Sequence, residues 1–377
     1  MIKVMSIFGT RPEAIKMAPV IQEMNRHRQE IQSVICVTAQ HREMLDSVLE
    51  TIQIVPDYDL NIMKQGQTLE AVTGRILEGL GAILEKEEPD LVLVHGDTTT
   101  TFASALSAFY HRIPVGHVEA GLRTYDLYAP YPEEANRQMV GSLAELHFTP
   151  TMRSLKNLLQ ENKNPEHIFV TGNTAIDALR TTVKETYDNP VLAWAEGKRI
   201  LLLTAHRREN WGEPLRRVFT AVSRITQCYP DLRVIYPCHM NPAVRGMAEE
   251  MFAGNEHVRL IEPLEVTDFH NLIKKSYLVL TDSGGIQEEG PSLGKPVLVV
   301  RETTERPEGV EAGTLKLVGT SAENIFREVS RLLEDTKAYE QMSRAENPYG
   351  DGHASERIVG AILRYFQNRE VPDEISA

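Results

Sequence analysis

Short, continuously apolar runs rich in β-branched residues alternate with helix-length amphipathic segments along almost the whole chain. Runs that are apolar at every residue are typical of parallel strands buried on both faces. Strands and helices that alternate in this way form α/β units with right-handed crossovers. The expected strands cover residues 3–8, 33–38, 91–95, 115–118 and 147–149, and then 199–204, 233–236, 258–260, 278–281 and 296–300. The expected helices cover residues 14–25, 68–87, 98–110, 214–229, 286–293 and 322–333.

The two series of strands predict an α/β protein with two parallel-sheet domains. At 377 residues the chain exceeds the usual size of a single hydrophobic core. The boundary is expected near Thr171-Gly172-Asn173, which gives a first domain over residues 1–171 and a second over residues 172–353. A terminal helix over residues 354–368 follows a Pro/Gly-rich loop. The pattern alone leaves open which of the two domains this helix covers.

The charge balance is acidic, with 40 Lys and Arg against 53 Asp and Glu and a net charge of −13. This balance argues against a nucleic acid or an anionic membrane as partner, because both attract clustered Lys and Arg. A small anionic ligand is compatible with this charge balance, because it needs only a local basic site.

The cysteines and the apolar segments predict a cytoplasmic protein. Cys36, Cys228 and Cys238 form no CxxC pair, and each is expected to be a buried free thiol in a reducing compartment. The apolar run at the N-terminus is too short for a signal peptide, and no stretch approaches the roughly 20 apolar residues of a membrane span.

The first strand leads into Gly9-Thr10-Arg11-Pro12, which is followed by Lys16. Gly9 permits a tight turn and Pro12 suits the first turn of a helix. Arg11 and Lys16 place two cations at a helix start whose free N–H groups already favour anions. Taken alone, this loop fits a capped helix with exposed bases equally well. The dinucleotide fingerprint GxGxxG and the phosphate-binding GxxxxGK[ST] are both absent.

Acidic residues follow the next strands in the first half. Asp97 ends the strand over residues 91–95, Glu119 ends the strand over residues 115–118, and Glu133 and Glu134 begin a later helix. Each alone is explained as well by helix capping or by the helix dipole. Because the carboxyl ends of parallel strands meet at one edge, we expect these carboxylates to converge there and to perform acid/base chemistry.

The second half carries a matching set of polar residues. His206 lies at the end of the strand over residues 199–204, and Ser283-Gly284-Gly285 follows the strand over residues 278–281. The Ser-Gly-Gly turn exposes backbone N–H groups at a helix start, which favours a diphosphate. Glu289 lies one helical turn further on, where its carboxylate can accept from two ribose hydroxyls, and Arg306 follows the next strand.

These segments carry a family resemblance that extends from about Ile2 to Phe366. The chain resembles the bacterial non-hydrolysing UDP-N-acetylglucosamine 2-epimerases. The motifs that carry the resemblance are, in order, FGTRPEAIKMAP, VLVHGDTTTT, GHVEAGLRT, PYPEEANR, TAHRREN, LTDSGGIQEE, TTERPEG and NPYGDG.

The resemblance implies a GT-B architecture, in which two Rossmann-like domains face a cleft and the segment 354–377 returns to the first domain. It implies a homodimer that binds UDP-N-acetylglucosamine and UDP, needs no cofactor or metal, and serves the biosynthesis of cell-envelope polysaccharides. By motif position, the acid/base residues would be Asp97, Glu119 and Glu133, with His206 at the departing UDP. The substrate-binding residues would be Arg11, Lys16, His206, Ser283, Gly284, Gly285, Glu289 and Arg306.

Some members of this family bind a second molecule of UDP-N-acetylglucosamine as an allosteric activator. The matching positions in this sequence would be Gln40, Glu43, Glu133, Arg207 and His239. The chain departs from one version of that pattern, because Glu43 replaces a Gln and Gly66 stands where an Arg can occur.

The chemistry of the implied reaction fits these residue types. The hydrogen on carbon 2 becomes acidic only when UDP leaves carbon 1, so a carboxylate removes it to give 2-acetamidoglucal. Reprotonation from the other face and re-addition of UDP then give UDP-N-acetylmannosamine. This route needs cations and N–H donors on the diphosphate and carboxylates around the sugar, in a site that keeps water out.

Three other functions remain as alternatives. A GT-B glycosyltransferase would use the same UDP site, and a hydrolysing epimerase would let water capture the intermediate. A catalytically silent nucleotide-sugar sensor is disfavoured because the acidic residues and His206 are intact. A metal site is also disfavoured, since Asp57-Tyr58-Asp59 imitates a DxD motif within a Pro-containing loop. Cys228, Cys238 and His239 lack zinc-site spacing.

Overall fold

The computed structural model describes residues 1–39, 42–64, 66–207 and 210–370, and these form two compact units. The first unit contains Met1–Ala178 together with the C-terminal segment from Gly350, and the second contains Leu179–Tyr349. The chain passes from the first unit to the second within α7 (Thr174–Thr182), a few residues after the boundary that the sequence suggested.

The first unit is built on a seven-stranded sheet in which every pair of neighbours is parallel, with the order β3-β2-β1-β4-β5-β6-β7. The strand order reverses between β1 and β4, as in Rossmann-like sheets. The strands are β1 (Ile2–Phe8), β2 (Ile31–Val37), β3 (Tyr58–Asp59), β4 (Leu91–His95), β5 (Val115–Val118), β6 (Leu146–Thr149) and β7 (Ile168–Val170).

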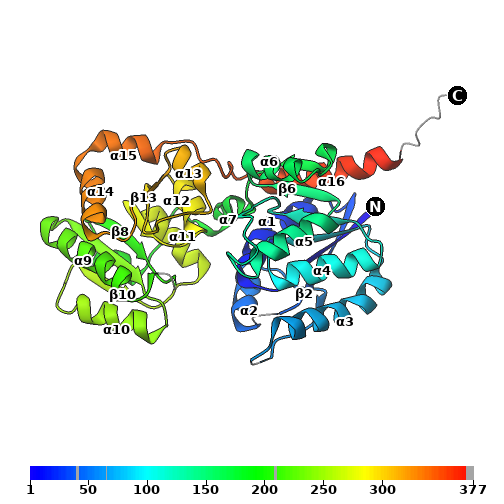
Figure 1. The fold of residues 1–377 in the computed structure, drawn as a ribbon, viewed down its shortest axis with the longest axis horizontal. Coiled ribbons are helices and arrows are strands. Elements are labelled where there is room, and N and C mark those ends of the chain that lie inside the picture. Colours follow the sequence, from blue (N-terminus) through cyan, green and yellow to red (C-terminus); the bar gives the residue numbers. More distant parts are fainter. Residues whose placement is uncertain (40–41, 65, 208–209, 371–377) are drawn as a thin grey trace. The chain divides into compact units, whose positions relative to one another are not determined.

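Helices cover both faces of this sheet (Figure 1). Val4 and Phe8 of β1 pack with α1, α2 and α16, whereas Met5 and Ile7 pack with α3, α4 and α5. Strands that are apolar at every residue are therefore buried on both faces, as predicted. The helices of this unit are α1 (Arg11–Arg26), α2 (Arg42–Thr51), α3 (Leu69–Glu87), α4 (Thr99–Tyr110), α5 (Glu133–Leu143), α6 (Met152–Gln160) and α16 (Ala354–Glu370), with a 3₁₀ turn at Pro165–His167.

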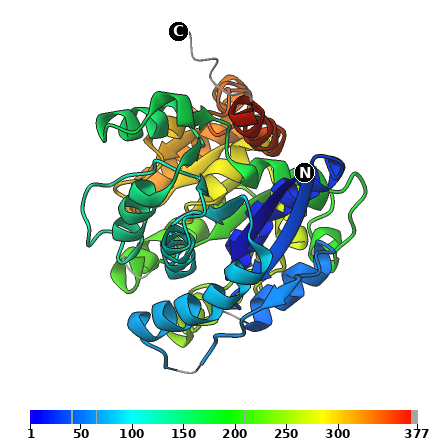
Figure 2. The ribbon, with the colours of Figure 1, turned by 90° about the vertical axis from the view of Figure 1, so that its right-hand side faces the viewer.

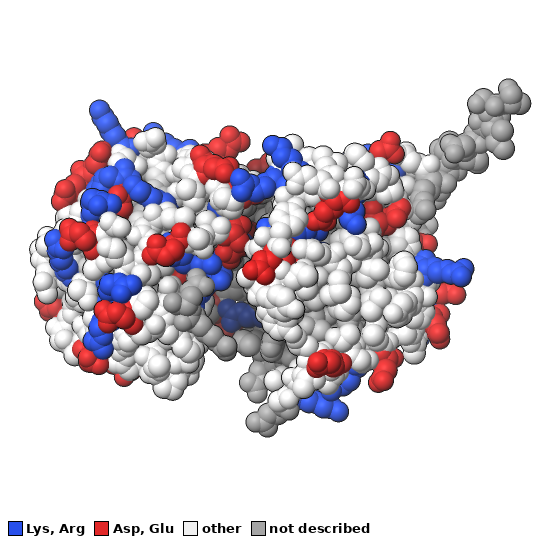
Figure 3. Space-filling view, viewed as in Figure 1, with Lys and Arg blue, Asp and Glu red and all other residues white. Residues whose placement is uncertain are grey.

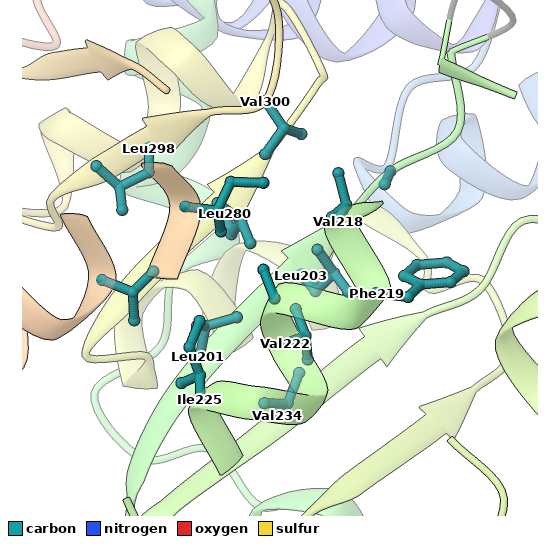
Figure 4. Close-up of a cluster of buried hydrophobic side chains, with 14 of the residues drawn as sticks. Leu201, Leu203, Val218, Phe219, Val222, Ile225, Val234, Leu280, Leu298 and Val300 are labelled. Atoms are coloured by element: carbon teal, nitrogen blue, oxygen red, sulfur yellow. The ribbon is translucent and has the colours of Figure 1, made fainter. Parts of the chain in front are cut away.

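The second unit repeats this design with a six-stranded parallel sheet of order β10-β9-β8-β11-β12-β13. Its core is divided between the two faces of the sheet, and on one face Val218, Phe219 and Val222 of α9 pack against Leu201 and Leu203 of β8 (Figure 4). The strands are β8 (Arg199–Thr204), β9 (Leu232–Pro237), β10 (Val258–Ile261), β11 (Leu278–Thr281), β12 (Val297–Val299) and β13 (Leu315–Leu317). The helices are α8 (Pro190–Trp194), α9 (Glu213–Cys228), α10 (Pro242–Met251), α11 (Val266–Lys275), α12 (Ile286–Ser292), α13 (Pro307–Glu311), α14 (Ala322–Glu334) and α15 (Thr336–Ser343).

The predicted fold class is confirmed, since the chain forms two Rossmann-like parallel-sheet domains of the GT-B class. Two details were wrong. Tyr58-Asp59 is not a loop but the edge strand β3, which pairs with Cys36 and Val37 of β2. Cys228 is exposed because it ends α9 on the outer surface, whereas Cys36 and Cys238 are buried as expected.

The charged residues are well mixed on the face drawn in Figure 3, where acidic and basic side chains form small interspersed groups on each unit. Within the described residues, no helix combines the length and the apolar character that crossing a membrane requires.

The C-terminal helix α16 is part of the first unit, where Ile358, Val359 and Ile362 join the core around α1. Both views show it beside the N-terminal part of the chain (Figures 1 and 2). The buried carboxylate of Asp177 in α7 caps α16. It accepts hydrogen bonds from the backbone N–H of Ala354 (3.1 Å) and from the backbone N–H and hydroxyl of Ser355 (2.7 and 2.6 Å).

Asp177→Ala should destabilise the protein by about 2–4 kcal/mol, because it removes a helix cap and leaves buried donors unpaired. Urea unfolding followed by circular dichroism measures the effect. Asp335→Ala is the matched control, since Asp335 caps α15 at an exposed site and its loss should cost less. Equal, small losses in both variants would show that the Asp177 contact does not hold α16.

Candidate active site

The candidate site residues lie where the strand order of each sheet reverses. In the first unit the loops after β1 and β4 flank this point, and in the second unit the loops after β8 and β11 do so. Open α/β sheets bind ligands at these positions, beyond the carboxyl ends of the strands.

In the first unit, a buried carboxylate joins the loop after β1 to the loop after β4. Glu13 accepts hydrogen bonds from the backbone N–H groups of Gly9 (3.0 Å) and Thr10 (2.8 Å). Its other oxygen accepts from the hydroxyls of Thr98 (2.7 Å) and Thr101 (3.0 Å). Glu13 is the third residue of α1 and completes a capping box with Thr10. These contacts fix the start of α1, so Arg11 occupies the first helical position.

Glu119 follows β5 with a left-handed backbone (φ 63°), a conformation that is uncommon outside glycine. Its carboxylate forms an ion pair with Lys16 of α1 and accepts a hydrogen bond from the side-chain amide of Asn173 (2.8 Å). The Nε2 atom of His95, at the end of β4, lies 3.8 Å from the same oxygen. Burial lowers the pKa of His95 to about 4, so this ring is neutral near pH 7.

Asp97 follows β4 and is held by two residues of α5. Its carboxylate pairs with Arg137 (2.6 Å), and its backbone carbonyl accepts from the side-chain amide of Asn136 (2.9 Å). Burial raises the pKa of Asp97 above its ordinary value. Arg137 opposes this shift, and the neighbouring carboxylates of Glu119 and Glu133 add to it. A carboxyl group with a raised pKa is suited to holding and returning a proton.

The two acidic residues at the start of α5 have different surroundings. The buried Glu134 accepts hydrogen bonds from the backbone of Thr124 (3.0 Å) and Tyr125 (3.1 Å) and from the side chains of Arg137 and Gln138. The Oε2 atom of Glu133 is also buried, but it has no hydrogen-bond partner among the described residues. Glu134 is thus a structural residue, whereas Glu133 is available for chemistry.

In the second unit, the buried carboxylate of Asp282 after β11 holds the loop after β8. One of its oxygens accepts from the backbone N–H groups of His206 and Arg207 (both 2.9 Å) and from the side chain of Asn210 (3.1 Å). The loop is therefore held through its backbone and Asn210. This leaves the imidazole of His206 42% exposed, 5.8 Å from the ring of His239 in a stacked arrangement. Burial lowers the pKa of His206, and His239 and Arg207 add to the effect, while Asp282 opposes it.

The Ser283-Gly284-Gly285 turn leads directly into α12. A Cβ atom on Gly284 would lie 3.2 Å from the carboxylate of Glu305 and 3.4 Å from the guanidinium of Arg306, so a side chain here would crowd both groups. Arg306 donates to Glu288 (2.7 Å) and lies 3.4 Å from Glu305.

Glu289 lies within reach of a buried histidine. The Nε2 atom of His270 is 3.6 Å from the carboxylate of Glu289, and its Nδ1 atom lies 2.7 Å from the hydroxyl of Thr182. The loop after β12 is also charged, since Glu305 contacts Arg207 (3.1 Å) and Arg301 (2.7 Å). Burial raises the pKa of Glu305, but the three arginines around it outweigh burial and lower it to about 2. Glu305 is therefore an anion at neutral pH.

The structure brings the expected residues together within each unit. Arg11, Lys16, Asp97, Glu119 and Glu133 surround the reversal point of the first sheet, and the polar residues of the second half surround that of the second. The residues of the second unit at the reversal point of its sheet are His206, Arg207, His239, Ser283, Gly284, Gly285, Glu289 and Arg306.

Of the expected activator positions, Gln40 lies outside the described residues, and so does the side chain of Glu43.

Several residues that hold these groups were not predicted from the sequence. His95 had a readable signal, as a polar residue that ends a buried strand. Asp282 follows a buried strand in the same way, whereas Asn173 follows β7, a strand that was not predicted. Glu13 had the signal of a capping box, since it lies three residues after Thr10. Arg137 and His270 gave no local signal, because their partners are distant in sequence.

Across residues 1–39, 42–64, 66–207 and 210–370, no group of three or more His, Cys, Asp or Glu side chains is arranged to hold a metal ion.

Comparison with known proteins decides the family. The family model described as UDP-N-acetylglucosamine 2-epimerase matches residues 22–363. The chain belongs to the UDP-N-acetylglucosamine 2-epimerase family. It is 58% identical to the UDP-N-acetylglucosamine 2-epimerase of Bacillus subtilis (strain 168) over 376 residues, which is 100% of this chain and 99% of that one.

Solved structures of similar proteins share this fold. A crystal structure of a protein from Listeria monocytogenes has a TM-score of 0.93 and 54% identity, with 97% of both chains covered. The crystal structure of UDP-GlcNAc 2-epimerase from Neisseria meningitidis bound to UDP-GlcNAc has a TM-score of 0.87 and 50% identity, covering 96% of this chain and 100% of that one. The family is that of an isomerase, as the sequence resemblance implied.

Replacing Glu133 and Glu134 one at a time should show which of these two acidic residues of α5 stabilises the fold. Glu134→Gln should cost about 2–4 kcal/mol of stability, because it turns an amide towards backbone donors and leaves Arg137 less compensated. Glu133→Gln should unfold close to the wild type in urea. Similar stabilities for the two variants would contradict the assignment of Glu134 as the structural residue.

The cost of Glu134→Gln should also depend on pH. Burial raises the pKa of Glu134, but its hydrogen bonds outweigh burial and lower the pKa below the ordinary value of 4.5. A carboxylate with a lowered pKa contributes stability above its unfolded pKa and loses it as the pH falls through the folded pKa. The difference between wild type and Glu134→Gln should therefore be complete above pH 4.5 and shrink below it.

Proposed function

We propose that this protein inverts carbon 2 of UDP-N-acetylglucosamine to give UDP-N-acetylmannosamine, by eliminating UDP and adding it back. The observation that carries this proposal is the group of three carboxylates, Asp97, Glu119 and Glu133, at one end of the first sheet. Removing a proton and returning one to the opposite face both require such groups, whereas a glycosyltransferase usually needs a single base.

In this proposal the second unit binds the UDP moiety. The N–H groups of Ser283-Gly284-Gly285 and the cation of Arg306 bind the diphosphate, and the carboxylate of Glu289 accepts from the ribose hydroxyls. Glu288 and Glu305 fix the guanidinium of Arg306 in place. Arg11 and Lys16 of the first unit add positive charge where negative charge develops on the departing UDP.

The elimination step breaks the bond between carbon 1 and the UDP oxygen, and the electron pair leaves with UDP. A carboxylate takes the proton of carbon 2, whose bonding electrons form the double bond of 2-acetamidoglucal. A second carboxyl group then protonates carbon 2 from the other face, and the UDP oxygen re-forms its bond to carbon 1. Asp97 suits a proton-holding role because burial and its acidic neighbours raise its pKa.

We also propose that this protein is a homodimer in the cytoplasm with an activator site. Phe109 and Tyr110 of α4 and Met139 of α5 are exposed apolar side chains on neighbouring helices, which suits a contact between copies. Arg207 and His239 lie beside His206, which supports the binding of a second nucleotide sugar near the substrate.

Incubation with UDP-N-acetylglucosamine in deuterated water tests the mechanism. Proton NMR should show UDP-N-acetylmannosamine with deuterium at carbon 2, because the second carboxyl group, which protonates carbon 2, carries a deuteron from the solvent. Chromatography of the same mixture separates the alternatives. Free N-acetylmannosamine with UDP would indicate a hydrolysing enzyme, and full retention of the original hydrogen in product and recovered substrate would contradict elimination.

His206→Ala tests the diphosphate role of the imidazole. Because the backbone of this loop is held by Asp282, the melting temperature should stay near that of the wild type. The affinity for UDP should fall about 10- to 100-fold, the scale of a hydrogen bond to a charged group. Calorimetric titration with UDP measures it.

Asp282→Ala is the matched control for the loop, since it removes the acceptor of three hydrogen bonds. It should lower the melting temperature. Unchanged UDP affinity in His206→Ala would remove His206 from the site.

A further inference from the structure

Asn173 lies three residues after the end of β7, and its side chain makes two hydrogen bonds, one as acceptor and one as donor. Its Oδ1 atom accepts from the backbone N–H of Ala175 (2.9 Å) and so caps α7, while its Nδ2 atom donates to Glu119 (2.8 Å). The side chain is almost fully buried. Because Oδ1 accepts from the helix N-terminus, the amide cannot flip without pointing N–H at N–H. Its donor therefore has one orientation, towards Glu119.

The backbone at Asn173 is held on both sides. A Cβ atom on Gly350 would lie 3.2 Å from Cα of Gly172 and 3.5 Å from the backbone nitrogen of Asn173, so only glycine fits there. Arg357 donates to the carbonyl of Thr171 (3.0 Å), and Asp177 binds the start of α16. Asn173 thus presents its N–H group from a fixed frame.

The ammonium group of Lys16, which also binds Glu119, is not fixed in this way. Lys16 reaches Glu119 through a flexible four-carbon chain, and in the proposed function its charge also serves the departing UDP. His95 is neutral and lies 3.8 Å from the carboxylate. When Lys16 turns towards the diphosphate, Asn173 is the donor that keeps its place.

We propose that Asn173 is a positioning residue for the epimerisation: its amide holds the carboxylate of Glu119 in the orientation that serves carbon 2. This inference rests on the proposed function. The left-handed backbone of Glu119 supports it, because strained residues need surroundings that fix them. Asn173 acts through Glu119 and has no assigned contact with substrate.

Two variants separate positioning from capping. Asp and Ser cap helices about as well as Asn, but neither donates an N–H to Glu119. Asn173→Ser should therefore melt near the wild-type temperature and keep the wild-type KM, whereas Asn173→Asp keeps the cap but should melt lower, because it places a second buried carboxylate beside Glu119. Their kcat should fall about 10- to 100-fold, the scale of a lost hydrogen bond to a charged group. Asn173→Ala removes both contacts and should lose stability as well.

The pH profile adds a second readout. In the described part of the chain, Glu119 faces Lys16 from α1, His95 from β4, Asp97 after β4 and His117 from β5, and the variants leave these groups unchanged. A second carboxylate beside Glu119 disfavours the ionised pair. The acid limb of kcat should thus move to higher pH in Asn173→Asp and move less in Asn173→Ser, which only removes the N–H donor that favours the ionised form of Glu119.

Wild-type turnover, measured first, separates this inference from the proposed function. A wild type that leaves UDP-N-acetylglucosamine unchanged would overturn the proposed function and this inference with it. An active wild type with equally active Asn173→Asp and Asn173→Ser, and with only Asn173→Ala impaired, would overturn this inference alone. Asn173 would then be a helix cap.

Discussion

In each unit, the candidate site residues depend on one buried carboxylate that accepts hydrogen bonds from the backbone N–H groups of a loop. Glu13 joins the loops after β1 and β4, and Asp282 joins the loops after β11 and β8. These strand pairs hold equivalent places in the two sheets, on either side of the point where the strand order reverses. A buried carboxylate is costly without partners, and charge-assisted bonds to backbone N–H groups provide them.

Because the loops are held through their backbone N–H groups, side chains of these loops remain available to bind ligands. The imidazole of His206 is 42% exposed, although the backbone of its loop is tied to Asp282. Lys16 occupies the second turn of α1, whose start Glu13 fixes. The contacts of Glu13 and Asp282 with backbone N–H groups therefore fix the loops mainly through their backbone.

Most strands of the two sheets could be predicted from the sequence, because a continuous run of apolar residues is a local signal of a buried strand. Residues 91–95, 115–118, 199–204 and 278–281 were placed at their observed bounds. Short strands such as β7 and β13 were not predicted, since three residues are too few to form a recognisable apolar run. The missed β7 also hid Asn173 as a polar residue at a strand end. The pairing of Lys16 with Glu119 was out of reach, because it depends on the strand order β1-β4-β5 and not on any spacing along the chain.

The carboxylates of the first unit differ in what surrounds them, and this difference bears on mechanism. Asp97 pairs with Arg137 and has a raised pKa, whereas Glu119 is held by Lys16 and Asn173. Burial disfavours charge on Asp97, and the charges of Glu119 and Glu133 disfavour it further, so ionising one member opposes ionising the next. Asp97 therefore holds a proton more readily than an ordinary aspartate. A reaction that takes a proton from one face of a carbon and returns one to the other needs such an arrangement, with one group ready to accept while another is ready to donate.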